Sequence, residues 1–186
     1  MTDLVTLSDY KTYKSISSIT FDTQLNEIIP AVSTYVKNYC GKTFIDYAFT
    51  DLIEIFSNGG NNLFLTETPI IDITSVEVSY DYGVSYTTLT ANVDYYIDVN
   101  NDSLYNPNGF PKILNAIRVN YTGGYISLPL DLKIATLDLI DYYINEDYKP
   151  KKTEGRSSME NSSNRQITVS ALPVHIQRVL EAYRGC

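Results

Sequence analysis

The spacing of apolar residues changes twice along this chain, from a helical period to a period of two and back again. Near the start, Thr6 is followed three residues later by Asp9, a pattern typical of a helix N-terminus. Val5 and Tyr10 are spaced to pack against each other across that end. These signals predict a short helix over about residues 7–14.

A second, longer helix is predicted between Asp22 and Gly41. Its apolar residues recur at helical spacing, and glycine often ends a helix because it tolerates positive φ. Pro30 lacks a backbone donor, so we expect it to kink this helix or to mark a later start. The apolar stripe consists of Leu25, Ile28, Ile29, Val32, Tyr35, Val36 and Tyr39.

From about residue 44 to 121, apolar and polar residues alternate, which is typical of β-strands. The segments "LIEIF" and "LFL" flank "SNGGNN", whose residues tolerate positive φ, and this arrangement predicts a hairpin. The alternation after Pro69 shifts phase, which predicts a β-bulge near Thr74 and Ser75. A further strand is expected in "VDYYIDV".

The last strand of this region, "AIRVNY", places Ile117, Val119 and Tyr121 on one face. The middle of the chain is therefore expected to form a small antiparallel sheet.

Helical spacing returns at Pro129, which suits a first turn because its missing N–H would be unpaired there. The main helix that follows has a wide apolar face and, opposite it, an acidic stripe of Asp131, Asp138 and Asp141. The apolar face consists of Leu132, Leu137, Leu139, Ile140, Tyr143 and Ile144.

Residues 149–168 are polar and poor in large apolar side chains, which is typical of a flexible linker or an exposed loop. A short amphipathic helix is predicted beyond them, with little chain nearby to bury its apolar stripe. That stripe consists of Ile176, Val179, Leu180 and Tyr183. We therefore expect a core domain over residues 1–148, the linker or loop, and a C-terminal segment over residues 169–186.

The net charge of −8 makes groove-reading recognition of DNA or RNA an unfavourable hypothesis, because such a surface repels phosphate. Two interpretations stay open. The charge serves solubility alone, or it keeps a surface near nucleic acid without adhering to it.

Candidate chemistry is sparse in this sequence. His175 is the only histidine, and with Cys40 and Cys186 it gives three scattered residues where a zinc site needs about four ligands. "DVNNDS", from Asp98, begins like a calcium loop but lacks its glycine and its final glutamate. We expect no enzymatic activity, no metal and no cofactor.

Two thiols in a chain of this length suggest a reducing compartment, and no apolar run approaches 18 residues. We therefore expect a soluble protein that is synthesised in a cytoplasm and has no membrane partner.

The junction between the last strand and the main helix reads "YTGGYISLP", with the predicted junction residues Tyr121, Gly123, Gly124, Tyr125 and Pro129. A strand that must turn sharply towards a helix needs unusual dihedral angles, which glycine supplies. We expect one of the two glycines to have positive φ.

This junction resembles the central motif of the head–tail connector (adaptor) proteins of tailed bacteriophages, in which a strand ends in tyrosine and glycine before a proline opens the main helix. In the present chain Pro129, Leu132 and Ala135 match the helix start. "YVKNYCGKTF", "NLFLTETPIIDITSVEV" and the ending "VLEAYR" resemble further segments of the family in the same order.

The resemblance implies an α+β fold, a small helical bundle with an antiparallel β-sheet or hairpin inserted between the second helix and the main helix, plus the C-terminal amphipathic helix on a tether. It also implies a structural virion protein at the head–tail junction, made in the bacterial host. The partners implied are the portal protein, further copies in a ring of commonly twelve, a tail-side joining protein, and double-stranded DNA that passes through without specific binding.

Two groups of residues acquire expected roles under this resemblance. The C-terminal stripe of Ile176, Val179, Leu180 and Tyr183 is expected to dock on the portal, with packing on the chain's own helices as the alternative. The acidic stripe of Asp131, Asp138 and Asp141 is a candidate channel lining, with a merely solvated face as the alternative. A different function also stays open, a carbohydrate- or surface-binding module that uses a tyrosine-rich sheet.

Overall fold

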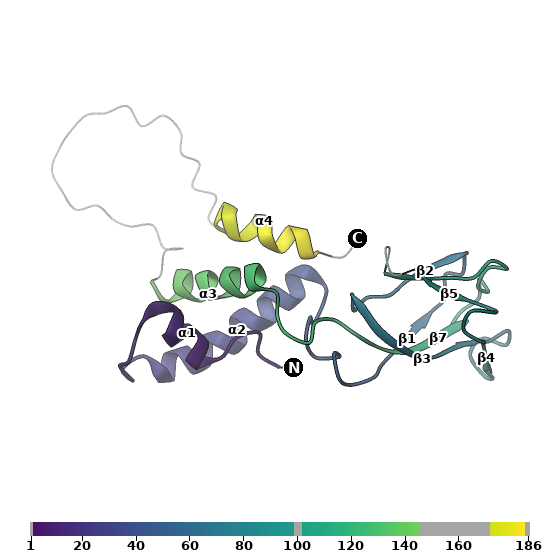
Figure 1. The fold of residues 1–186 in the computed structure, drawn as a ribbon, viewed down its shortest axis with the longest axis horizontal. Helices are drawn as coiled ribbons and strands as arrows, with labels where there is room; N and C mark the ends of the chain where they lie inside the picture. Colours follow the sequence, from purple (N-terminus) through teal and green to yellow (C-terminus); the bar gives the residue numbers. More distant parts are fainter. Residues whose placement is uncertain (1, 99–101, 146–171, 185–186) are drawn as a thin grey trace, which may run out of the picture. The chain divides into compact units, whose positions relative to one another are not determined.

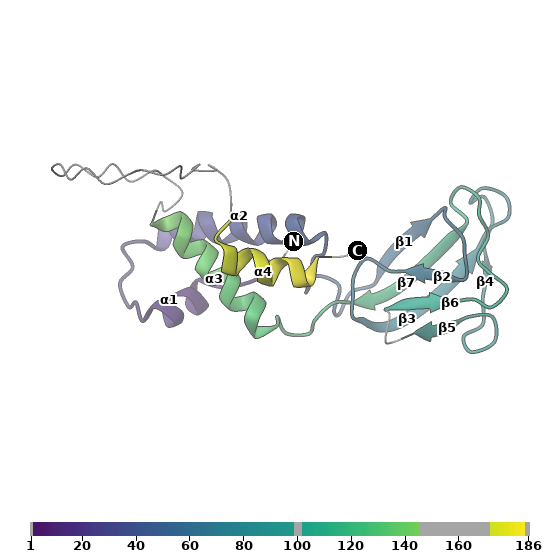
Figure 2. The same cartoon turned by 90° about the horizontal axis from the view of Figure 1, so that it is seen from above.

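The computed structural model describes residues 2–98, 102–145 and 172–184. It divides into two compact units, and apart from the chain ends the chain passes from one to the other at residues 39–40 and 129–130. A helical unit comprises residues 3–39 and 130–184, and a sheet unit comprises mainly residues 40–129 (Figures 1 and 2). The expected linker at residues 149–168 lies outside the described residues.

The first half of the helical unit follows the local sequence signals closely. Helix α1 spans Leu7–Lys14, and Thr6 and Asp9 form the predicted capping box. Helix α2 spans Asp22–Cys40 and continues through Pro30, and Gly41 follows it with φ +70°. The two helices that were predicted here are therefore confirmed.

The second half consists of α3, Leu130–Ile144, and α4, Val174–Tyr183. Helix α3 begins directly after Pro129 and buries Leu132, Leu137, Leu139 and Ile140. Helix α4 packs against α3, as both ribbon views show. The expectation that α4 finds little chain to bury it is therefore wrong, and the alternative of packing on the chain's own helices is what the structure has.

The sheet unit contains two antiparallel sheets rather than one. The four-stranded sheet has the order β1 (Leu52–Phe56), β7 (Ile117–Gly123), β3 (Ile70–Val78) and β4 (Thr87–Thr88). The three-stranded sheet has the order β2 (Asn62–Phe64), β6 (Ser103–Tyr105) and β5 (Tyr96–Asp98).

The predicted hairpin between "LIEIF" and "LFL" is wrong. Strand β1 pairs with β7, whereas β2 pairs with β6, so the two segments belong to different sheets. The loop between β1 and β2 is bonded to a distant segment of the chain. The Phe110 amide donates to the Gly60 carbonyl, and the Asn106 amide donates to the Asn61 carbonyl. Glycine- and asparagine-rich sequence marks a turn here, but it does not determine which strands pair.

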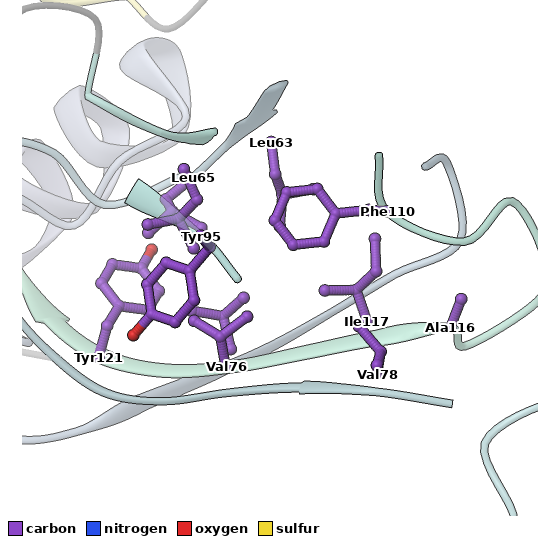
Figure 3. Packing of buried hydrophobic residues seen from close by; sticks show 11 residues of the cluster. Leu63, Leu65, Val76, Val78, Tyr95, Phe110, Ala116, Ile117 and Tyr121 are labelled. Atoms are coloured by element: carbon purple, nitrogen blue, oxygen red, sulfur yellow. The ribbon is translucent and has the colours of Figure 1, made fainter. Parts of the chain in front are cut away.

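The core of the sheet unit lies between the two sheets. Side chains from both sheets and the adjoining loops point toward one another, as Figure 3 shows. The predicted inward face of β7 is confirmed, since Ile117, Val119 and Tyr121 are all fully buried. The predicted bulge is confirmed too, as a register shift between Ile73 and Ser75.

Candidate functional site

The backbone of the junction after β7 is tightly constrained. Gly124 has φ +96°, and a methyl group added there would collide with the Phe44 carbonyl. Phe44 itself has φ +69°, which is a strained conformation for a bulky residue, and its carbonyl accepts the Tyr125 amide at 2.6 Å. The expectation that one glycine of the pair has positive φ is confirmed at Gly124.

Gly123 is required for a different reason. Its φ lies outside the left-handed region, but a side chain there would collide with the Glu67 carbonyl. Its amide donates to the Tyr47 carbonyl at 3.1 Å, and this hydrogen bond holds the end of β7 against the loop that contains Tyr47. Both glycines therefore permit close backbone approach, and one of them also supplies the turn.

Buried polar contacts behind this junction involve Glu67, which is 3% exposed. Its carboxylate accepts the amides of Thr43 and Phe44, and its own amide donates to the Tyr121 hydroxyl at 2.9 Å. Burial raises the pKa of Tyr121 well above its usual range. The segment after α2, which holds Thr43 and Phe44, and strand β7, which holds Tyr121, are thus both bonded to the loop that contains Glu67.

The acidic stripe of α3 carries hydrogen bonds within the helical unit. Each of its carboxylates accepts a hydrogen bond from a tyrosine hydroxyl. The donor is Tyr183 for Asp131, Tyr13 for Asp138 and Tyr10 for Asp141. Asp141 is also 3.0 Å from Lys14, and Asp138 is 3.8 Å from the imidazole of His175. The stripe therefore links α3 to α1 and α4, which neither of the two sequence-based interpretations anticipated.

These contacts change the titration of the groups that make them. Burial, with the Asp141 charge adding to it, raises the pKa of Tyr10 to about 12. The hydrogen bond to Asp138 raises the pKa of Tyr13. On the same interface, the hydrogen bond from Lys133 lowers the pKa of Asp9 to about 2. The stability that Asp9 contributes is therefore present above its ordinary pKa and is lost as the pH falls through about 2.

The terminal stripe is divided by the fold. Ile176 is 1% exposed and Leu180 is fully buried, so both lie in the interior of the helical unit. Val179 and Tyr183 are partly buried, and Arg184 lies over the ring of Tyr39 on α2. In this conformation Ile176 and Leu180 are not exposed anchors for another protein.

Charge is divided unevenly between the two units. The sheet unit has ten acidic and three basic side chains, which gives a net charge of −7. The helical unit has twelve acidic and eleven basic side chains, which gives a net charge of −1. One of the three basic residues, Arg118, already pairs with Glu77. The uncompensated negative charge of the chain thus belongs almost entirely to the sheet unit.

The described residues bring no metal-binding set together. Within them, no three His, Cys, Asp or Glu side chains are placed to hold an ion, and His175 has a side chain that is 69% exposed. Cys40 is buried at the end of α2.

None of the helices in the described part has the length and apolar character that a bilayer crossing needs.

Comparison with protein families decides the assignment. A family model described as "Head completion protein" matches residues 3–186. The chain belongs to this family. The resemblance to head–tail connectors that was inferred from the sequence is thereby confirmed, and the carbohydrate-binding alternative gains no support.

Part of the chain is similar to a phage protein with the same description. The head completion protein of Escherichia phage T5 is 36% identical over 67 residues, which are 36% of this chain and 37% of the relative. The alignment therefore spans little more than a third of that protein's length.

Two solved structures have a similar fold. One is a chain from the neck of an empty GTA particle in a structure with C6 symmetry, with TM-score 0.59, 15% identity and coverage of 98% of this chain and 90% of that one. The other is from the neck of a native GTA particle with C12 symmetry, with TM-score 0.55, 14% identity and coverage of 100% and 94%. At these identities the similarity establishes the fold.

The sequence reasoning missed Phe44 and Glu67 at the junction. Glu67 lies in "LTETP" between two threonines, which is a typical exposed turn composition, and Phe44 follows a helix end where an apolar residue is ordinary. No local signal distinguishes them. Both matter because the end of β7 brings distant residues beside them: Gly124 contacts Phe44, and Tyr121, 54 residues further along the chain, contacts Glu67.

Proposed function

We propose that this head completion protein is a structural component of the phage neck, where identical copies form a ring that joins the head to the tail and surrounds the path of the genome. The observation that carries the proposal is the family match over residues 3–186. The similar chains in necks with C6 and C12 symmetry support a ring, and twelve copies is the number we expect.

The chemistry of the chain is compatible with a role that is not enzymatic. The residues with unusual environments form a tightly bonded backbone junction rather than an open pocket with reactive groups. They are Gly124, Phe44, Glu67 and Tyr121. We propose that the portal protein lies on one side of the ring, a tail-side joining protein on the other, and duplex DNA in the middle.

The two sites predicted from sequence remain proposals. Docking on the portal through Ile176 and Leu180 requires α4 to leave its place against α3, because both side chains are buried there. A channel lining by Asp131, Asp138 and Asp141 is compatible with their tyrosine partners, because a neutral hydroxyl leaves the carboxylate charge in place. The charge of Asp141 is offset by the Lys14 ammonium at 3.0 Å, so Asp131 and Asp138 would carry most of that lining.

Phage particles that lack this chain test the proposal. We expect a null mutant to accumulate DNA-filled or leaking heads without tails, and the chain supplied from a plasmid to restore infectious particles, as counted by plaque assay and electron microscopy. Infectious tailed particles formed without the chain, or purified virions from which mass spectrometry cannot recover it, would contradict the neck assignment.

Weak binding to duplex DNA is a second expected result. Because the net charge is −8, the purified protein has no general attraction for phosphate, and we expect no saturable binding at physiological salt. Fluorescence anisotropy of a labelled duplex, measured from low to physiological salt, checks this. Tight binding that weakens steeply with added salt would show a phosphate-binding surface and contradict a path through which DNA slides.

A further inference from the structure

The outer face of strand β1 presents an apolar surface that the described part of the chain leaves exposed. Ile53 is 59% exposed and Ile55 is 54% exposed, and Phe49, four residues before Ile53, is 78% exposed. The alternate residues of β1 point inward, where Leu52 and Phe56 pack on the core and Glu54 accepts the Tyr121 hydroxyl. We refer to Ile53 and Ile55 as the β1 surface.

Strand β1 is also an outer strand of its sheet. It pairs with β7 along its whole length, and among the described residues no strand lies on its other side. An exposed, regular and apolar edge strand favours association with another chain, because it offers both apolar area and unpaired backbone groups.

The opposite side of the same sheet is protected against such association. Strand β4 covers β3 only at Glu77 and Val78, and the rest of β3 has two register shifts and an exposed charge at Asp72. The Ile70 and Ile73 amides there are directed at the carboxylates of Asp102 and Asp72. Bulges and charges are the usual devices that prevent edge pairing. Strand β1 has no register shift, and its one charged residue, Glu54, accepts the Tyr121 hydroxyl and is not on the outer face.

Charge indicates what kind of partner the β1 surface fits. On the adjoining β7, the residue paired with Ile55 is Arg118, which is neutralised by Glu77 and lies over the Tyr86 ring. This part of an otherwise strongly acidic unit is therefore balanced, with an arginine beside the apolar residues. Another acidic copy of the chain meets less repulsion at Ile53 and Ile55 than at the exposed Asp72. The carboxylate of Asp51, which directly precedes β1, accepts the Thr74 hydroxyl.

We infer that the β1 surface is a contact between neighbouring copies of this chain in the assembled ring. The inference rests on the proposed function, and it specifies which surface of each subunit meets the next copy. A ring requires a surface of this kind on every subunit, facing a different surface of its neighbour.

Photo-crosslinking in assembled particles tests this directly. With p-benzoylphenylalanine at Ile53 or Ile55, irradiation of purified particles is expected to give a covalent dimer of this chain, identified by mass spectrometry. The same group at Val84, which is 84% exposed in a turn of the same unit, is the matched control, and its dimer yield is expected to be at least tenfold lower. Equal yields, no dimer, or an adduct with a different protein would overturn the inference.

A substitution gives a second measurement. The double variant Ile53→Thr/Ile55→Thr keeps β-branched residues on exposed positions, so its melting temperature is expected to match the wild type, as is that of the control Val84→Thr. We expect incorporation of the double variant into particles to fall at least tenfold and that of the control to stay unchanged. If the double variant is incorporated normally, the inference about β1 is overturned but the proposed function is not. If purified wild-type particles do not contain this chain, the proposed function is overturned as well.

Discussion

Replacing Gly124 by alanine or valine is expected to lower the free energy of unfolding by about 3 kcal/mol or more. Two costs add at this position, since a side chain at φ +96° is strained and its Cβ collides with the Phe44 carbonyl. That carbonyl cannot move away freely, because it accepts the Tyr125 amide and belongs to a residue that is itself at positive φ. Urea unfolding followed by circular dichroism measures the loss.

Gly60→Ala is the matched control for this measurement. The nearest atom to an added methyl group at Gly60 is the Asn62 carbonyl oxygen at 3.9 Å, and its φ lies outside the left-handed region. We expect its stability to stay within about 0.5 kcal/mol of the wild type. Equal unfolding of Gly124→Ala and Gly60→Ala would mean that the junction backbone is not constrained as described.

The elements that sequence predicts well here are those whose determinants are local. Helix α1 follows from Thr6 and Asp9, which form a capping box within four residues, and α2 ends at a glycine with the left-handed φ that such an end requires. The inward face of β7 follows from strict alternation at Ile117, Val119 and Tyr121. In each case the physical cause lies within a few residues of the element.

Strand pairing was less accessible, because its cause is not local. "LIEIF" and "LFL" have the pattern of hairpin strands and the loop between them has suitable turn residues, yet each strand pairs with one far along the chain. The loop between them is bonded to Phe110 and Asn106, which lie more than 40 positions away. The alternation was sufficient to predict strands but not their partners.

The candidate sites show the same limit. The sequence predicts both glycines of the junction, but not Glu67, whose importance depends on two segments meeting around it. It predicts the acidic stripe of α3, but not that Tyr10 and Tyr13, on a helix more than 100 residues earlier, donate to it. A hydrophobic stripe on α4 likewise indicates that something buries it, and only tertiary structure identifies α3 as the element that does so.

The second large effect is expected at Leu180. Because this side chain is fully buried in the helical unit, Leu180→Ala removes packed apolar volume and is expected to cost about 2–5 kcal/mol of stability. Val174→Ala, at a 62% exposed position in the first turn of α4, is the matched control and is expected to change stability by less than about 0.5 kcal/mol. Thermal unfolding followed at 222 nm compares the two variants.

Removal of residues 167–186 extends this test to the whole helix. The truncation deletes the buried Ile176 and Leu180, the Tyr183 hydrogen bond to Asp131 and the Arg184 contact with Tyr39, and it uncovers the apolar residues of α3 that α4 contacts. We therefore expect the truncated chain to melt well below the wild type or to precipitate. If it instead keeps the wild-type melting temperature and fails only to join portal-containing heads, α4 contributes little to its own unit, and docking on the portal becomes the better account of its apolar stripe.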